Sequence, residues 1–184
     1  EDLALLASYA LIAAGYKGIY TSSNELSFDL QASTCLKALE SATRNTGILG
    51  ATGGQFVDIY PPDQKIETIK NVIHLKTITL YELAFVYGWL FGGGDHESLE
   101  KIKKLAWHFG MAFQIADDLG DFEEDLARNC QSNFAVVNGK KLSCEILKKE
   151  YTSFQNALCS LSLMTEEFEE LISYLKEKEA LFLA

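Results

Sequence analysis

The residues best suited to chemistry lie in one acidic stretch, residues 113–125, which follows an apolar run. Six of the nine residues that begin with Asp117 are acidic. If the preceding helix continues, four polar residues share one of its faces by three- and four-residue spacing: Gln114, Asp117, Asp118 and Asp121. Like charges placed this way repel each other, so a cation is the simplest stabilising partner. Mg²⁺ typically takes one or two protein carboxylates and completes its shell with water and phosphate oxygens, which predicts a site for Mg²⁺ and a diphosphate.

A solvated acidic helix end that runs into an acidic loop is the alternative interpretation of this stretch. The position of the aspartates favours the metal site, because they follow a stripe of apolar residues that should be buried. The stripe consists of Leu105, Phe109, Ala112, Phe113 and Ala116. Carboxylates at the end of a buried helix are held more rigidly than those on a loop.

Polar side chains also follow a glycine-rich segment, residues 47–58. Its glycines recur every three or four residues, which clears one helix face so that another helix or a ligand can approach the backbone closely. Close packing alone would explain the glycines. Gln55 and Asp58 lie one turn apart on the adjoining face, where packing would favour apolar residues.

A third polar group, Lys76-Thr77, lies within an apolar helical pattern that runs from Lys65 to about Phe91. A lysine in such surroundings either extends its amine to the surface or contacts an anion. The sequence alone leaves these two interpretations open.

The elements that must position these residues are helices. Only two prolines occur, adjacent at Pro61 and Pro62, and long periodic segments almost free of helix breakers predict an all-α protein. We expect helices over residues 3–15, 24–49, 65–91, 99–122, 143–163 and 166–182, with a polar loop at 16–23 and no assignment for 126–138. Asn24 is the expected N-cap of the second helix.

The first apolar run, Leu3 to Gly15, is too short for a membrane span of about 20 residues. Its acidic start also carries the wrong charge for a signal peptide. We therefore expect a buried helix. The sequence has no initiator Met and begins directly with this helix, so we expect the natural chain to continue upstream of Glu1.

Composition limits the classes of partner. With 184 residues, 48% of them hydrophobic, and no internal repeat, residues 1–184 should form a single domain. The 16 basic and 26 acidic residues give a net charge of −10, which argues against nucleic acid or an anionic membrane as a general partner. The cysteines have no spacing typical of a zinc site or a disulfide framework: Cys35, Cys130, Cys144 and Cys159. Reduced, mostly buried thiols in the cytoplasm are expected.

Three motifs in this order resemble the trans-isoprenyl diphosphate synthases, the polyprenyl synthase family that includes farnesyl and geranylgeranyl diphosphate synthases. They are Gly53-Gly54-Gln55-Phe56-Val57-Asp58, Lys76-Thr77 and Phe113-Gln114-Ile115-Ala116-Asp117-Asp118-Leu119-Gly120-Asp121. The resemblance covers Leu3 to about Val137. It implies an all-α isoprenoid-synthase helical bundle, usually a homodimer. Such an enzyme uses Mg²⁺ to ionise an allylic diphosphate and joins it to isopentenyl diphosphate, which gives a longer trans-prenyl diphosphate.

The resemblance also implies a role for each motif residue. Asp117, Asp118 and Asp121 match the second aspartate-rich motif of the family and would bind Mg²⁺. Lys76 would contact the allylic diphosphate, and Thr77 with Gln114 would lie beside the developing cation. Phe113 would line the isoprenoid pocket, while Gln55 and Asp58 would support the site between helices.

Two features depart from the family pattern. The first aspartate-rich motif and its arginines belong on a helix upstream of Leu3, so the chain resembles the C-terminal portion of the bundle without its N-terminal helices. We therefore expect residues 1–184 alone to be inactive. The family also places a lysine shortly after the second motif, where residues 125–132 hold only Arg128 and the next lysines are Lys140 and Lys141.

Three alternatives remain open. The chain could be a non-catalytic partner subunit of a prenyl diphosphate synthase, or a terpene cyclase of the same fold. It could also be a helical interaction module with an acidic surface. Mg²⁺-dependent thermal stabilisation by diphosphate would separate the first two from the third. The sequence leaves product chain length open, because the residues that set it in the family lie near the first motif.

Overall fold

The computed structural model describes residues 2–130 and 132–183, and every regular element in these residues is helical, which confirms the all-α prediction. The elements are α1 (Asp2–Asn24), α2 (Phe28–Thr46), α3 (Ala51–Ile59), α4 (Ile66–Ile73), the π-helical segment η1 (His74–Ile78), α5 (Thr79–Phe91), α6 (Leu99–Gly120), α7 (Phe122–Ala127), α8 (Phe134–Asn138), α9 (Lys140–Ser160) and α10 (Glu166–Leu183).

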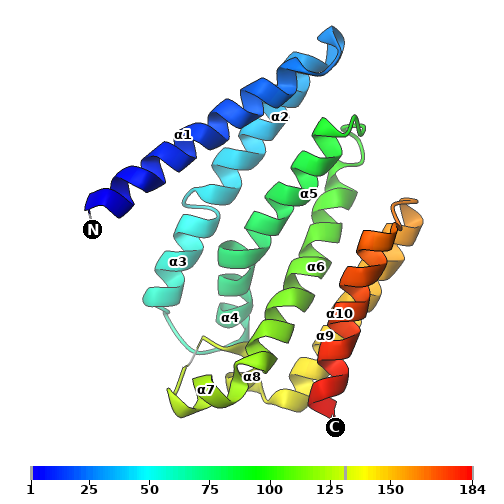
Figure 1. Cartoon of the computed structure of the whole chain (residues 1–184). Coiled ribbons are helices and arrows are strands. Elements are labelled where there is room, and N and C mark those ends of the chain that lie inside the picture. The colour runs from blue at the N-terminus through cyan, green and yellow to red at the C-terminus, as the bar shows by residue number, and fades with distance from the viewer. Residues whose placement is uncertain (1, 131, 184) are drawn as a thin grey trace.

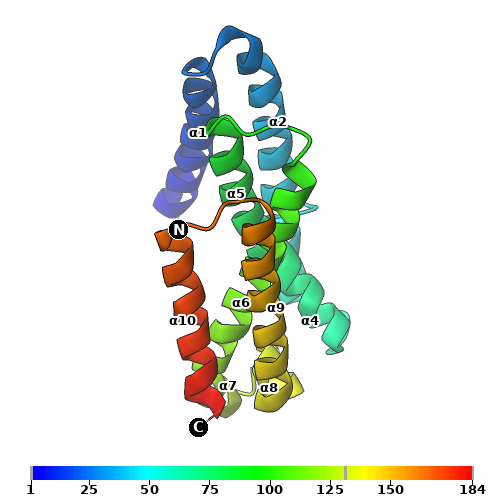
Figure 2. The same ribbon diagram turned by 90° about the vertical axis from the view of Figure 1, so that its right-hand side faces the viewer.

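The central element is α6, which packs against α5 on one side and α9 on the other (Figure 1). Helix α10 lies alongside α9 and also contacts α6, as the second view shows (Figure 2). The short helices α7 and α8 lie together at the C-terminal end of α6, and α1 with α2 forms a hairpin on the far side of α5. The bundle therefore has one end that carries the acidic stretch.

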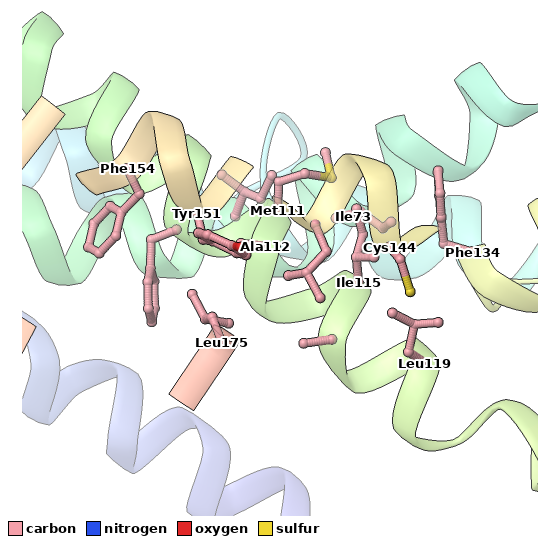
Figure 3. Packing of buried hydrophobic residues seen from close by; sticks show 14 of the residues in the cluster. Ile73, Met111, Ala112, Ile115, Leu119, Phe134, Cys144, Tyr151, Phe154 and Leu175 are labelled. Atoms are coloured by element: carbon pink, nitrogen blue, oxygen red, sulfur yellow. The ribbon is translucent and has the colours of Figure 1, made fainter. Parts of the chain in front are cut away.

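The main core forms around α6 because its apolar stripe faces α9 and α10. Leu105, Ala112 and Ala116 are fully or almost fully buried, and Phe113 is partly buried, as the stripe predicted. Figure 3 shows Met111, Ala112, Ile115 and Leu119 of α6 beside Tyr151 and Phe154 of α9 and Leu175 of α10. Burial of apolar area at about 25 cal/mol per Å² is the main force that holds these helices together.

The helix predicted over residues 65–91 is interrupted by η1, a five-residue π-helical segment that contains Lys76 and Thr77. Helix α3 packs directly on this segment: a Cβ added to Gly54 would lie 2.4 Å from the backbone nitrogen of Lys76. The glycine-rich face therefore serves close helix packing, one of the two uses expected from the sequence. Isolated π turns are frequent at functional sites.

The prediction of a short buried helix at residues 3–15 followed by a loop at 16–23 is wrong. Helix α1 runs unbroken to Asn24, and only Ile19 and Ser23 are buried, because α1 packs mainly on α2. Leu3 and Leu11 are 83% and 73% exposed. Among the described residues α1 is also the one helix that is long and apolar enough to cross a membrane, which by itself is weak evidence for a span.

Other boundaries shift by a few residues. Ser27, rather than Asn24, precedes the first residue of α2, and Gly47 ends that helix before Ile48 and Leu49. Helix α6 ends at Gly120, and the unassigned segment 126–138 contains the end of α7 and all of α8. The four thiols are free, but only Cys144 is buried and Cys159 is exposed, so the expectation of mostly buried thiols is wrong.

Candidate active site

Several of the predicted site residues lie on η1, on the last turns of α6 and on α3. These segments lie near the end of the bundle where α6 meets α7 and α8 (Figure 1). A small cavity of about 100 Å³ opens between these elements and α3. Its lining is mostly polar and consists of Asp58, Val72, Ile73, Lys76, Thr77, Gln114, Asp118, Asp125, Cys130, Ser132 and Asn133. Residues from all three sequence motifs therefore line one cavity.

Lys76 is held in place by Asp58. Its Nζ lies 2.6 Å from Oδ2 of Asp58, across the contact that Gly54 makes possible between α3 and η1. The carboxylate side chain is 14% exposed and the lysine side chain 42% exposed. The amine thus lies at the cavity surface with one carboxylate on it and donors left for an anion, which favours the anion contact over simple extension into solvent.

Thr77 and Gln114 form the next contact, between η1 and α6. The hydroxyl of Thr77 donates to Oε1 of Gln114 at 2.9 Å. The amide nitrogen of Gln114 in turn donates to Oδ1 of Asp118, also at 2.9 Å. This chain of hydrogen bonds fixes the orientation of the Gln114 amide, with its oxygen toward η1.

Asp118 faces the interior. It is 8% exposed, and its second oxygen accepts a 2.7 Å hydrogen bond from the backbone N–H of Phe134. Burial raises the pKa of Asp118 to about 6, while the hydrogen bonds from Gln114 and Phe134 act in the opposite direction. Because both oxygens already accept hydrogen bonds, Asp118 fixes the start of α8 in this structure.

Asn133 is a site residue that the sequence analysis missed. It is 2% exposed, and its side-chain amide donates to the backbone oxygen of Asp118 and to Oδ2 of Asp125. Its own oxygen accepts from the N–H of Val136 and caps α8. The sequence contains one indication of this role, because an Asn directly before a short apolar run, here residues 134–137, is typical of a helix N-cap.

Asp117 and Asp121 lie on the exposed side of the end of α6, one turn apart. Partial burial raises the pKa of Asp117, and the negative charge of Asp121 raises it further. Two exposed carboxylates that repel each other on one helix face fit a hard divalent cation, which needs only one or two protein oxygens. Within residues 2–130 and 132–183 no group of three His, Cys, Asp or Glu side chains could hold a metal ion, so the three predicted aspartates do not form one cluster.

Phe113 belongs to an aromatic face that leads away from the cavity. Its ring lies 5.5 Å from that of Tyr81 on α5 and 6.5 Å from that of Tyr174 on α10. The face continues through Phe109 to Phe85. Partly buried aromatic rings such as Phe113 and Tyr81, beside the acidic end of α6, suit the hydrocarbon part of an amphiphilic substrate.

Gln55 also lies outside the cavity. Its side chain is exposed and does not line the cavity. It is one turn from Asp58 on α3, but Asp58 points to Lys76. The structure therefore brings together Asp58, Lys76, Thr77, Gln114 and Asp118, with Asp117 and Asp121 on the adjacent turn.

Comparison with known proteins adds an independent observation. The family model described as polyprenyl synthetase matches residues 2–136. The chain is 32% identical to a geranylgeranyl diphosphate synthase of Cyanophora paradoxa over 188 residues, which covers 97% of this chain and 58% of that protein. It is 35% identical to geranylgeranyl pyrophosphate synthase 11, chloroplastic, of Arabidopsis thaliana, with 67% of this chain and 35% of that one covered.

A trans-prenyltransferase of African swine fever virus (isolate Pig/Kenya/KEN-50/1950) is 31% identical over 52% of this chain and 29% of its own length. Among solved structures, an apo FPP/GFPP synthase from Zymomonas mobilis matches with a TM-score of 0.64 and 24% identity, over 79% of this chain and 51% of that one. This structural likeness supports the fold. The chain spans between about a third and 58% of the length of the synthases it matches.

Proposed function

The chain belongs to the polyprenyl synthetase family, and we propose that the protein is a Mg²⁺-dependent trans-prenyltransferase. It would condense an allylic diphosphate with isopentenyl diphosphate to make a longer trans-prenyl diphosphate. The observation that carries the proposal is the hydrogen bond from Thr77 to Gln114, which joins η1, the segment of Lys76 and Thr77, to α6 one turn before Asp117.

The charged residues would act on the diphosphate. As the carbon–oxygen bond of the allylic diphosphate breaks, negative charge grows on the leaving group, and fixed positive charge lowers that barrier. Lys76 would supply one such charge, held by Asp58. Asp117 and Asp121 are the residues that would hold Mg²⁺, and a bound Mg²⁺ neutralises the charge of the leaving diphosphate. Asp118 would position α8 rather than bind metal, since both its oxygens accept hydrogen bonds.

The polar pair Thr77 and Gln114 would act on the hydrocarbon end. Loss of diphosphate leaves an allylic cation, whose carbon forms the new bond with the double bond of isopentenyl diphosphate before a proton leaves. A hydroxyl and an amide oxygen stabilise positive charge through their dipoles without themselves becoming bonded. The hydrogen bond between them holds both oxygens in a fixed orientation.

Substitution of the exposed aspartates tests the proposal. In the full-length protein, Asp117→Ala and Asp121→Ala should each lower the rate of Mg²⁺-dependent prenyl transfer by orders of magnitude. The circular dichroism spectrum should stay unchanged. The unfolding midpoint should stay unchanged or rise slightly, because the repulsion between the two carboxylates is relieved. Glu124→Gln is the matched control, since Glu124 lies in the same acidic stretch but pairs with Arg128. Unfolded variants would show that these carboxylates are structural and would contradict the metal assignment.

Lys76 provides a second, independent test. Lys76→Ala should weaken binding of the allylic substrate and slow its ionisation. Lys76→Arg should keep partial activity, because a point contact to phosphate depends more on charge than on shape. Steady-state kinetics with each substrate varied in turn would measure both effects. Unchanged kinetics in the alanine variant would mean that the pair with Asp58 serves packing alone.

A further inference from the structure

A lysine on the last helix, Lys178, faces the acidic end of α6. Helix α10 contacts both α6 and α9, and both α6 and α10 run toward the end of the bundle that carries the acidic stretch (Figure 1). The family match ends at residue 136, so α10 lies outside the part of the chain that the family model describes.

The register of the two helices places Lys178 beside Asp117. The ring of Tyr174 stacks on that of Phe113, with 6.5 Å between centroids and 27° between planes. Leu175, the next residue, is fully buried in the core beside α6 and α9 (Figure 3). Because the helices run in the same direction, one further turn along each, four residues, brings Lys178 level with Asp117.

The amine of Lys178 is available to a ligand. Its Nζ lies 5.5 Å from the centre of the Tyr174 ring, and the residue is half-buried. In the part of the chain that the structure describes, Lys178 has no carboxylate within 4 Å. Lys178 is thus level with Asp117 along the bundle without forming an ion pair with a carboxylate of the described residues.

The lysines that follow the acidic stretch in sequence are less suitable. Residues 122–139 contain no lysine. Lys140 is already engaged, because its Nζ lies 2.8 Å from Glu123 and 4.3 Å from the centre of the Phe122 ring. Lys178 therefore offers the positive charge that the segment after the acidic stretch does not supply.

We propose that Lys178 binds phosphate oxygens of the diphosphate held at Asp117 and Asp121, as a substrate-binding residue contributed by α10. This inference rests on the proposed function. With Lys76 on the η1 side and Lys178 on the α10 side, the diphosphate would lie between two lysines that approach from opposite sides of α6. Each would balance part of the negative charge of the ligand.

Binding of inorganic diphosphate in the presence of Mg²⁺, measured by titration calorimetry on the full-length protein, tests the proposal. Lys178→Gln should raise the dissociation constant about ten- to a hundredfold, the range of a hydrogen bond to a charged group. Lys178→Arg should stay within a few-fold of the wild type. Lys176→Gln is the matched control, because Lys176 lies on the same helix but turns toward Gln155 and Tyr151 of α9.

A second titration, with Mn²⁺ alone, separates phosphate binding from a structural role. Removal of a positive charge beside Asp117 should leave metal affinity unchanged or raise it, so Lys178→Gln should weaken diphosphate binding without weakening metal binding. Weaker binding of both ligands would overturn the proposal, since Lys178 would then only organise the carboxylates. Equal diphosphate binding by Lys178→Gln and wild type would also overturn it and leave the proposed function standing. No diphosphate binding by the wild type would overturn the proposed function itself.

Discussion

Asp117 and Asp118 are adjacent residues with opposite surroundings. A helix turns by about 100° per residue, so Asp117 faces solvent while Asp118 faces the start of α8. Spacing alone predicted that both would share one face with Gln114 and Asp121. Spacing could not distinguish Asp117 from Asp118, because both lie three or four residues from Gln114 and from Asp121. Only the position of α8, which no local pattern predicted, gives Asp118 its buried, hydrogen-bonded surroundings.

The separation of roles can be tested by stability. Asp118→Ala leaves the N–H of Phe134 and the amide of Gln114 without their acceptor, and should lower the free energy of unfolding by about 1–3 kcal/mol. Asp117→Ala is the neighbouring control and should not destabilise the fold. Urea unfolding of both variants gives the comparison. Equal midpoints for the two would contradict the structural role of Asp118.

A second residue-scale prediction concerns alkaline pH. Tyr151 donates a 2.5 Å hydrogen bond to Glu179, and burial, followed by the effects of Glu179, raises the pKa of Tyr151 to about 12. Its unfolded pKa is about 10. The folded state therefore holds the proton more tightly, so this contribution to stability is complete below pH 10 and is lost as pH rises toward 12.

The measurement is the free energy of unfolding as a function of pH between 9 and about 12. Tyr151→Phe should show a shallower decline than the wild type over this range, because it has no phenol at this position to ionise. Tyr20→Phe, at an exposed position on α1, is the control and should follow the wild type. Parallel curves for Tyr151→Phe and wild type would refute the assignment.

At the scale of elements, periodicity predicted most helices but not their interruption. Residues 65–91 have apolar residues at helical spacing throughout, yet the structure forms a π turn over His74–Ile78. A π turn differs from an α turn by one residue, which an apolar pattern tolerates. The tight contact of Gly54 with Leu75 and Lys76 is a tertiary feature and lies beyond any local pattern, although the glycines indicated that some close approach would occur.

Two glycine substitutions should change the stability of the fold in opposite directions, and the first of them tests this contact. Gly54→Ala would place a Cβ 2.4 Å from the backbone of Lys76, and should destabilise by about 1–3 kcal/mol as in other overpacked sites. Gly88→Ala, within α5, meets nothing within 4 Å and should stabilise by about 0.5–1 kcal/mol through helix propensity. Thermal unfolding of both variants measures the difference. A neutral Gly54→Ala would mean that α3 and η1 are not in close contact.

At the scale of the whole molecule, α1 is the element least explained by the rest of the chain. Its exposed apolar side chains are Leu3, Leu5, Leu6, Tyr9, Leu11, Ile12, Tyr16 and Tyr20. An apolar surface of this extent marks an interaction site in a soluble protein. Its residues predicted a buried helix by composition, but burial depends on a partner surface, which the sequence of one chain does not specify.

The resemblance implies a homodimer, and we propose that α1 forms part of its interface. Between Leu3 and Tyr16 no residue is charged, so two copies of α1 would not repel each other. Leu11→Glu should raise the dimer dissociation constant at least tenfold, and analytical ultracentrifugation would measure it. Leu181→Glu, an equally exposed leucine on α10, is the control. A monomeric wild type, or a dimer insensitive to Leu11→Glu, would contradict the proposal.

The short length of α7 and α8 has a consequence for motion. These helices have six and five residues, too few to be stable alone. They are held by hydrogen bonds of Asn133 and Asp118 and by the buried side chain of Phe134. The free energy needed to open this corner is therefore much smaller than that needed to separate α6 from α9. Amide hydrogens of α8 should exchange with solvent long before those of α6. The acidic end of the bundle should thus open more often than the packed helices α6 and α9 behind it.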